Sequence, residues 1–202
     1  MAPVIISTDK MQLTQFSWGK LAYPVYLTLG NIPRALHLKP SQNACILIAY
    51  LSVSKDVGKN LTQKQQSAQI QQIFHNSMHL VPEPLIQAGK EGMEVAGGDG
   101  KECQVFPILA CYVTNYPKQC LVTSAKYGTC PRCLSRKLGE RDPGPRHTQQ
   151  AMLGAIRKAQ EHAASETHFQ RLCKEELVSG GVRWPFCDIH LSITPDILHQ
   201  LY

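Results

Sequence analysis

The sequence predicts an α/β fold in which helices flank a mixed β-sheet. The first third of the 202-residue chain carries three apolar runs separated by turn residues, the pattern of adjacent strands. A segment with helical spacing follows, and then a fourth apolar run and two polar helical segments. With 43% hydrophobic residues the chain can bury a core, so we expect one globular domain with room for a small inserted module.

The three expected strands are residues 4–8, 24–29 and 44–51. Their β-branched and aromatic residues suit a sheet whose central strands are covered on both faces. Cys45, in the third run, and Cys111, farther along the chain, are expected to be small core residues.

An amphipathic helix is expected from about Leu61 to Pro82 and Pro84, where it ends or kinks. The side chains that recur at helical spacing are Ile70, Ile73, Phe74, Ser77, Met78 and Val81. His75 and His79 are four residues apart, which is the ligand spacing of zinc proteases, but position 76 is Asn and the general-base Glu is absent. We interpret the two histidines as part of a solvated or partly buried helix face.

A hairpin is expected next, with short strands at 93–95 and 103–106 joined by the glycine-rich turn 97–100. The apolar run 108–113 is expected to be a buried strand. It stops at 114–117, where a helix can begin.

In the second half of the chain, residues 136–146 are rich in charge, Gly and Pro and are expected to form a loop. Polar helices are expected at 147–164 and 167–178, and a last helix would have Thr194 as its N-cap and Pro195 in its first position. The whole order of strands and helices fits the ribonuclease H arrangement, one of the few α/β topologies that match it.

Asp9 directly follows the first expected strand. A carboxylate at a strand end, held by the sheet and open to solvent, is well placed to bind a hard cation such as Mg²⁺. The alternative is a turn-forming Asp that caps the next segment.

Cys130 and Cys133 form a Cys-Pro-Arg-Cys knuckle whose two thiolates can reach one tetrahedral Zn²⁺. No second tight pair completes the site, and the candidate ligands are Cys120, Cys173, Cys187, His147, His190 and His199. A redox pair would instead place its first Cys at a helix start after a strand, and the proline and loop composition here favour zinc.

Asp196 and His199 are three residues apart on the expected last helix and therefore share one face. They could share a metal, a phosphate or a hydrogen bond. The alternative is capping by Asp196 in the first turn, beside an ordinary surface histidine.

The net charge of +6 fits a polyanionic partner. No apolar run is long enough to span a membrane and no signal peptide is visible, so an intracellular protein is expected. The eight cysteines are spread over a chain too long to need disulfide stapling, and we expect reduced thiols.

Ten segments carry a resemblance: IISTDK (5–10), QLT (12–14), YPVYLTLGNI (23–32), KPS (39–41), LSVSK (51–55), EPLIQAGK (83–90), FPILA (106–110), QCLV (119–122), CPRC (130–133) and TPDILHQL (194–201). In this order they resemble the Plavaka-type transposases of fungi, within the wider CACTA group. The resemblance covers almost the whole chain.

This resemblance implies a ribonuclease H-like nuclease domain that uses three acidic residues and two divalent ions, Mg²⁺ or Mn²⁺. Asp9 would be the first acid. The second would align with Asn115, whose neutral amide oxygen brings no charge to hold two cations together. Asp196 is the rival candidate, and its Asp-x-x-His pattern with His199 looks like a supporting signature of related transposases.

The third acid, a Glu on a later helix, would lie beyond Tyr202, so an incomplete domain is expected. Cys130 and Cys133 would belong to a zinc-binding insertion. The expected segments are 1–128, the first part of the ribonuclease H-like domain; 129–182, the Cys-x-x-Cys and helical insertion; and 183–202, the start of the next catalytic-domain helix.

The first functional hypothesis is part of the catalytic domain of a cut-and-paste DNA transposase, inactive as it stands. It would act in the nucleus on transposon ends and target DNA, and could do so as a homo-oligomer; neither a membrane nor a small-molecule cofactor is expected. The alternative is a noncatalytic nucleic-acid-binding or zinc-stabilised remnant of a transposable element. A third hypothesis is an unrelated α/β protein with a redox Cys pair.

Overall fold

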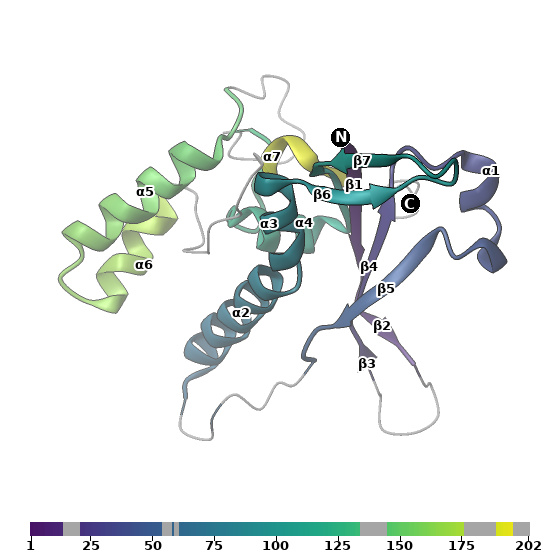
Figure 1. Cartoon of the computed structure of the whole chain (residues 1–202). Coiled ribbons are helices and arrows are strands. Elements are labelled where there is room, and N and C mark those ends of the chain that lie inside the picture. The colour runs from purple at the N-terminus through teal and green to yellow at the C-terminus, as the bar shows by residue number, and fades with distance from the viewer. Residues whose placement is uncertain (14–20, 54–57, 59–60, 134–144, 176–188, 196–202) are drawn as a thin grey trace. The chain divides into compact units, whose positions relative to one another are not determined.

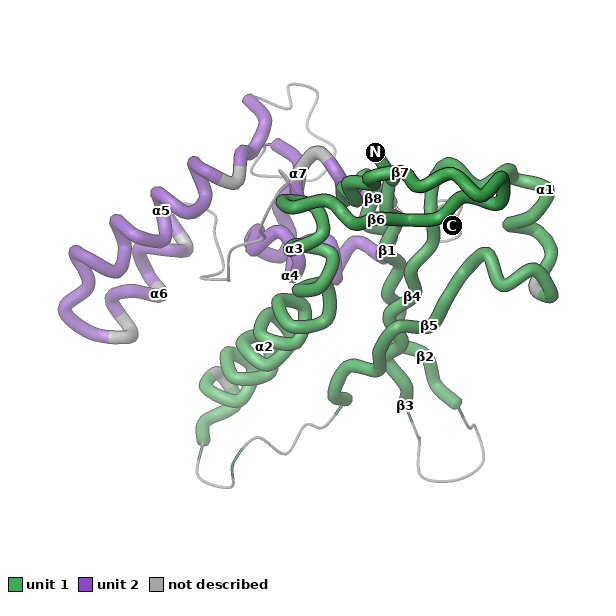
Figure 2. Tube along the Cα trace, viewed as in Figure 1, with its two compact units in different colours: residues 1–113, 185–187 green, residues 114–184, 188–202 purple. Residues whose placement is uncertain are grey.

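The computed structural model describes residues 1–13, 21–53, 58, 61–133, 145–175 and 189–195 (Figure 1). The chain divides into two compact units, with unit 1 covering Met1–Val113 and unit 2 beginning at Thr114 (Figure 2).

Four strands form a mixed sheet in the order β5-β4-β1-β8. They are β1 (Ala2–Thr8), β4 (Pro24–Leu29), β5 (Cys45–Tyr50) and β8 (Pro107–Thr114). β4 runs antiparallel to both β1 and β5, whereas β1 and β8 are parallel. The four expected strands and the mixed α/β class are therefore confirmed.

Short elements connect these strands. They are β2 (Met11–Gln12), β3 (Leu21–Ala22), the helix α1 (Arg34–His37) and the 3₁₀ turn η1 (Pro40–Gln42). β2 and β3 pair antiparallel and extend the β1–β4 hairpin beyond the sheet, whereas α1 and η1 lie in the connection from β4 to β5.

β5 is far less covered than its apolar sequence suggests. Ile46 is 55% exposed and Tyr50 66% exposed, and Cys45 is exposed as well. The core position expected for Cys45 is wrong. The reason is tertiary: among the strands that the structure describes, β5 pairs with β4 alone and forms an edge of the sheet.

The expected long helix is α2 (Gln63–Leu80), and a second helix, α3 (Glu83–Glu91), follows it in Figure 1. Thr62 begins α2 with a capping box, because its side chain accepts from the Gln65 backbone and Gln65 reaches back to the Thr62 backbone. Phe74 and Met78 are buried, whereas Ile70 and Ile73 remain about two-fifths exposed. The buried face of α2 is therefore narrower than the sequence pattern predicts.

The expected hairpin is confirmed as β6 (Met93–Ala96) and β7 (Glu102–Val105). Gly92 joins α3 to β6 with φ +78° and ψ 161°, a backbone conformation essentially restricted to glycine.

Unit 2 begins with the helix expected after β8. Its elements are α4 (Tyr116–Thr123), α5 (Gln149–His162), α6 (Glu166–Glu175), α7 (Ile189–Ser192) and β9 (Ile193–Pro195). α5 and α6 confirm the two polar helices, and they share a small core built from Ala125, Met152, Ile156, Ala159 and Cys173.

One expected helix start is wrong. Pro195 is the last residue of β9 rather than the first residue of a helix. The buried side chain of Ile193 lies in the same extended segment, and proline fits extended backbone as well as a first helical turn.

Candidate functional site

Asp9 lies just beyond the carboxyl end of β1 and is half-buried. The hairpin pairing keeps one register on both sides of it; the flanking pairs are Thr8 with Val25 and Met11 with Ala22. Counting inward, Asp9 lies opposite Pro24 and Lys10 lies opposite Tyr23. Pro24 has no backbone N–H to donate to the ladder, so the strand pairing is interrupted at Asp9.

A group of buried hydroxyls lies beside this interruption. The Thr8 hydroxyl and the Tyr112 hydroxyl of β8 are 2.8 Å apart and share a hydrogen bond. Thr8, Tyr23 and Tyr112 are all almost completely buried. We call these three residues the hydroxyl cluster.

Burial and neighbouring groups raise the pKa of both phenols in the hydroxyl cluster. Burial raises the pKa of Tyr23, the Thr8 hydroxyl opposes this, and the negative charge of Asp9 raises it further. Burial also raises the pKa of Tyr112, with a smaller contribution from Tyr23. Both phenols are therefore neutral at physiological pH.

Tyr23 is held at both its ends. Its backbone carbonyl accepts a 2.8 Å hydrogen bond from the Leu51 N–H, just beyond β5. Its ring stacks on Phe74 of α2, with the ring centroids 6.0 Å apart and the planes 19° apart. Helix α2 therefore packs against Tyr23, the residue opposite Lys10 in the hairpin.

The sequence analysis missed the hydroxyl cluster. Tyr112 stands in an apolar run and Thr8 in an apolar strand, so neither carries a local signal of chemistry. Only the parallel pairing of β1 with β8, which places Ile6 beside Tyr112, brings the two hydroxyls together. The sequence does contain one indication of the cluster, because Thr8 and Tyr112 place hydroxyl groups within otherwise apolar strands.

Asn115 follows β8 and acts as the N-cap of α4. Its side-chain oxygen accepts from the backbone N–H of Lys118 at 3.3 Å. An aspartate would cap this helix equally well, so capping by itself does not explain the amide. In unit 1, Ser7 of β1 pairs with Val113 of the parallel strand β8, and Asp9 follows two residues after Ser7. Asn115 belongs to unit 2.

Asp196 and His199 lie outside the described residues. Among the residues that the structure does describe, no three His, Cys, Asp or Glu side chains gather closely enough to hold a metal ion. Of the acids that the resemblance implies, the described part of the chain therefore contains Asp9 alone.

The Cys130–Cys133 segment contains a backbone contact to sulfur. The Arg132 N–H donates to the Cys130 sulfur at 3.4 Å. The chain then returns alongside it: Cys133 bridges to Arg146, and the His147 N–H donates to the Arg132 carbonyl at 3.0 Å. Cys130 lies in a loop rather than at a helix start, which disfavours a thioredoxin-like redox pair.

Tyr116 and Cys120 of α4 support the turn that precedes the knuckle. The Tyr116 hydroxyl accepts from the Gly128 N–H and donates to the Thr129 carbonyl, at 3.0 and 2.9 Å. Burial raises the pKa of Cys120, and the nearby Cys130 thiol contributes in the same direction. The turn at 128–129 is therefore held by Tyr116 of α4.

The two histidines of α2 have different environments. His79 is exposed, whereas His75 is only 5% exposed and has its ring edge against Phe74. Burial lowers the pKa of His75 to about 4, so the imidazole is neutral. The partly buried helix face expected from the sequence fits this arrangement.

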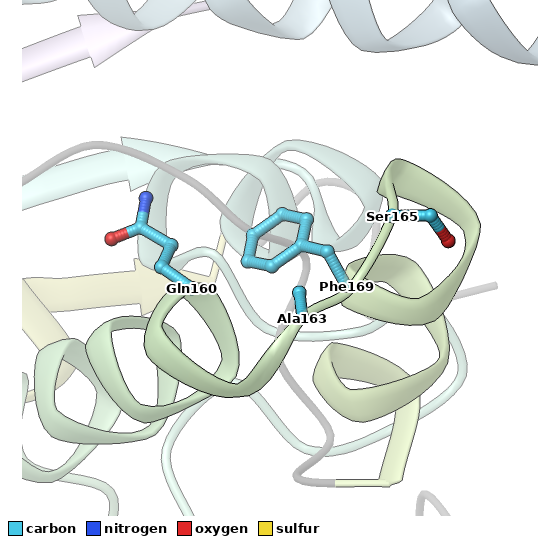
Figure 3. Close-up of a pocket in the computed structure, with 4 residues that line it drawn as sticks. All are labelled: Gln160, Ala163, Ser165 and Phe169. Carbon is cyan, nitrogen blue, oxygen red and sulfur yellow. The ribbon is translucent and has the colours of Figure 1, made fainter.

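An open depression of about 250 Å³ lies at the turn between α5 and α6 (Figure 3). It is lined by Gln160, Ala163, Ser165 and Phe169, which Figure 3 shows as sticks with the Phe169 ring between Gln160 and Ser165. None of these four side chains is an acid, base or metal ligand of the kind that phosphodiester chemistry needs.

No helix within the described residues is long and apolar enough to cross a membrane. No curated protein and no solved structure matches the chain. A family model described as Plavaka transposase matches residues 1–202, which is the whole chain. Membership of that family implies a transposase function and DNA as the partner. The chain belongs to the Plavaka transposase family.

Proposed function

We propose that the chain carries the first metal-binding carboxylate of a ribonuclease H-like transposase site, and that this residue is Asp9. The observation that supports the proposal is the position of Asp9 at the carboxyl end of β1, between an antiparallel and a parallel neighbour and at an interruption of the hairpin ladder. A carboxylate there is fixed by the sheet yet half-exposed, so it can reach a ligand in solvent.

Divalent ions bound at such a site, Mg²⁺ or Mn²⁺, supply activation of a water or DNA 3′-hydroxyl and stabilisation of the attacking and leaving oxygens. The part of the protein is to present the Asp9 carboxylate at the end of β1, where the sheet fixes its backbone. DNA, as transposon ends and target, is the proposed substrate, and the nucleus is the proposed place of action.

The second part of the proposal concerns Asn115. The family resemblance aligns an acid there, and an amide oxygen is a weaker ligand that adds no charge. We infer that the chain with Asn115 binds divalent ions weakly and does not cleave DNA. Asp196 with His199 remains the rival for the second acid.

A cleavage assay with labelled duplex DNA and Mg²⁺ or Mn²⁺ tests both parts. We expect no cleavage by the unmodified chain. We expect Asn115→Asp to keep the α4 cap, to tighten Mn²⁺ binding by about 10-fold or more, and to allow cleavage, since each coordinating carboxylate adds a charged ligand. Asp9→Ala in the same background should remove both gains.

If the unmodified chain cleaves DNA and Asp9→Ala does not, the proposed role of Asp9 stands. The inference that Asn115 abolishes cleavage would then be refuted. Mn²⁺ affinity that is the same with Asn and Asp at position 115 would assign the second acid elsewhere. DNA binding without any metal dependence, in every variant, would favour the alternative function, a noncatalytic nucleic-acid-binding remnant.

We also propose that Cys130 and Cys133 bind Zn²⁺ and stabilise a small insertion. The support is the N–H to sulfur contact at Cys130 and the return of the chain at Cys133. The other ligands are among the candidates that the sequence offers, which are Cys120, Cys173, Cys187, His147, His190 and His199; within the described residues no three such side chains gather around one point.

Zinc content per chain, measured by mass spectrometry after purification without added metal, tests this proposal. We expect about one Zn²⁺ per chain, lost in Cys130→Ser and in Cys133→Ser, because structural zinc needs its thiolates. Cys103→Ser, at an exposed cysteine of β7, is the matched control and should keep its zinc. Zinc retained in both knuckle variants would refute the site.

A further inference from the structure

An exposed tyrosine stands at the tip of a turn in unit 2. Residues 126–129 form a β-turn, in which the Thr129 N–H donates to the Lys126 carbonyl at 3.1 Å. Gly128 is the third residue of this turn and has φ +93°, which glycine adopts without strain. Tyr127 precedes it, and the side chain of Tyr127 is 70% exposed. The turn therefore presents an aromatic ring to solvent.

Side-chain contacts fix the turn. The Thr129 hydroxyl donates to the Lys126 carbonyl at 2.6 Å, and the Tyr116 hydroxyl of α4 bonds to the backbone of both Gly128 and Thr129. The Tyr127 ring contacts the Tyr116 ring, with the centroids 5.7 Å apart and the planes at 46°. A ligand of Tyr127 thus meets a preorganised ring, and little conformational entropy is lost on binding.

The sequence around the turn carries cations and no carboxylates. No Asp or Glu occurs in residues 103–139. The turn begins with Lys126, and Arg132 follows it as an exposed side chain. The exposed Arg146 returns beside this segment, because Cys133 bridges to Arg146. Phosphate groups are therefore attracted to this part of unit 2.

We propose that Tyr127 is a stacking platform for an unpaired DNA base. The cations beside it, Lys126, Arg132 and Arg146, contact the phosphates on either side of that base. Aromatic rings bind single strands in this way because every base has a π face, while basic side chains follow the backbone. The inference rests on DNA as the partner, which the family implies, and is independent of the metal site at Asp9.

The test is fluorescence anisotropy of the 202-residue chain with a labelled single strand and with the matching blunt duplex. Tyr127→Ala should raise the Kd for the single strand by about 10-fold, the effect of losing one stacked base, and should leave the duplex Kd nearly unchanged. Tyr127→Phe keeps the ring and should bind the single strand as the unmodified chain does. Tyr50→Ala is the matched control, because Tyr50 is 66% exposed on β5 in unit 1.

Arg132→Ala and Arg146→Ala test the phosphate contacts. Each should raise the Kd of both DNA forms and reduce the slope of log Kd against log salt concentration by about 1, because fewer counterions are released. Lys101→Ala is the control for loss of an exposed cation, since the Lys101 ammonium lies 3.5 Å from the Asp99 carboxylate. It should change neither the Kd nor the slope.

Tyr127→Trp reports stacking directly. Adding the single strand should quench its fluorescence more than that of the unmodified chain, which already contains two tryptophans. Adding the duplex should produce no such difference. Circular dichroism of each variant checks that the helices are retained.

The outcomes separate this inference from the proposed function. Single-strand binding that is unchanged in Tyr127→Ala overturns the stacking platform and leaves DNA standing as the partner. A loss of equal size for single strand and duplex also overturns it, because a paired base cannot stack on the ring. Absence of binding to either DNA form by the unmodified chain overturns both the platform and the proposed DNA substrate.

Discussion

His75 is a titratable side chain buried on a helix whose other polar residues mostly face solvent. Burial is the single cause that lowers its pKa, from 6.5 to about 4. At the sequence level it was one of a pair with His79 at ligand spacing, and only the fold distinguishes the buried member from the exposed one. The same holds for Asp9: its place at a strand end was predictable, but the hydroxyl cluster beside it depends on a β-strand about a hundred residues away.

His75 should make the protein less stable in mild acid. Since the folded-state pKa is lowered, the unfolded chain binds the proton more readily, and stability present at neutral pH is lost as pH falls from about 6.5 towards 4. The slope should approach about 1.4 kcal/mol per pH unit within that window. Urea unfolding at several pH values measures this slope. The His75→Gln variant should show a flatter dependence of stability on pH between about 6.5 and 4. An unchanged slope in that variant would show that other groups cause the dependence.

At the scale of elements, local patterns predicted most of the strands and helices, because alternation, helical spacing and turn residues act within a few positions. α3 was not predicted, since Pro82 and Pro84 suggested only an end to α2; in the structure they stand at the N-cap and in the first turn of α3, where proline is tolerated. The exposure of β5 was not predictable either, because an apolar strand shows no local difference between the middle and the edge of a sheet.

Gly92→Ala should destabilise the α3–β6 junction by about 1–3 kcal/mol, because the backbone there is close to glycine-only. A Cβ would also lie 2.8 Å from the Gln104 side chain, which donates to the Glu91 carbonyl at 3.1 Å. Gly98→Ala is the control, since nothing lies within 4 Å of its added Cβ. Equal melting temperatures for the two variants would contradict this assignment.

Thr62→Ala should lower the free energy of unfolding by about 1 kcal/mol, since it removes the hydroxyl that accepts from the Gln65 N–H and keeps only the half of the α2 capping box donated by the residue-62 backbone. Thr62→Ser keeps the hydroxyl and should restore most of that loss. Urea denaturation followed by circular dichroism measures both variants. No difference between Ala and Ser at this position would mean that the cap does not stabilise α2.

At the scale of the whole molecule, the family, the mixed α/β class and the transposase function agree with what the sequence motifs implied. The division at residues 128 and 182 stays a prediction, and so does the ribonuclease H topology. Asp196 and His199 lie outside the described residues, so the second acid was not settled by structure. What the fold adds is the setting of Asp9, because register and burial arise only when distant segments pair.

DNA binding by the whole chain should depend strongly on salt, because the net charge is +6 and phosphate contacts release counterions. The dissociation constant for a labelled duplex should rise by about 10-fold or more between about 50 and 200 mM salt. Fluorescence anisotropy measures it, and affinity independent of salt would argue against a phosphate-binding surface.

The claim that Asp9 binds a divalent metal ion is tested most directly by a crystal structure of the chain. The crystals would be grown with Mn²⁺, and the anomalous scattering of manganese would locate the ion. We predict an anomalous peak within about 2.2 Å of an Asp9 carboxylate oxygen, as expected for direct coordination of such an ion by a carboxylate. Manganese bound elsewhere, with the Asp9 carboxylate turned away from every metal ion, would contradict it.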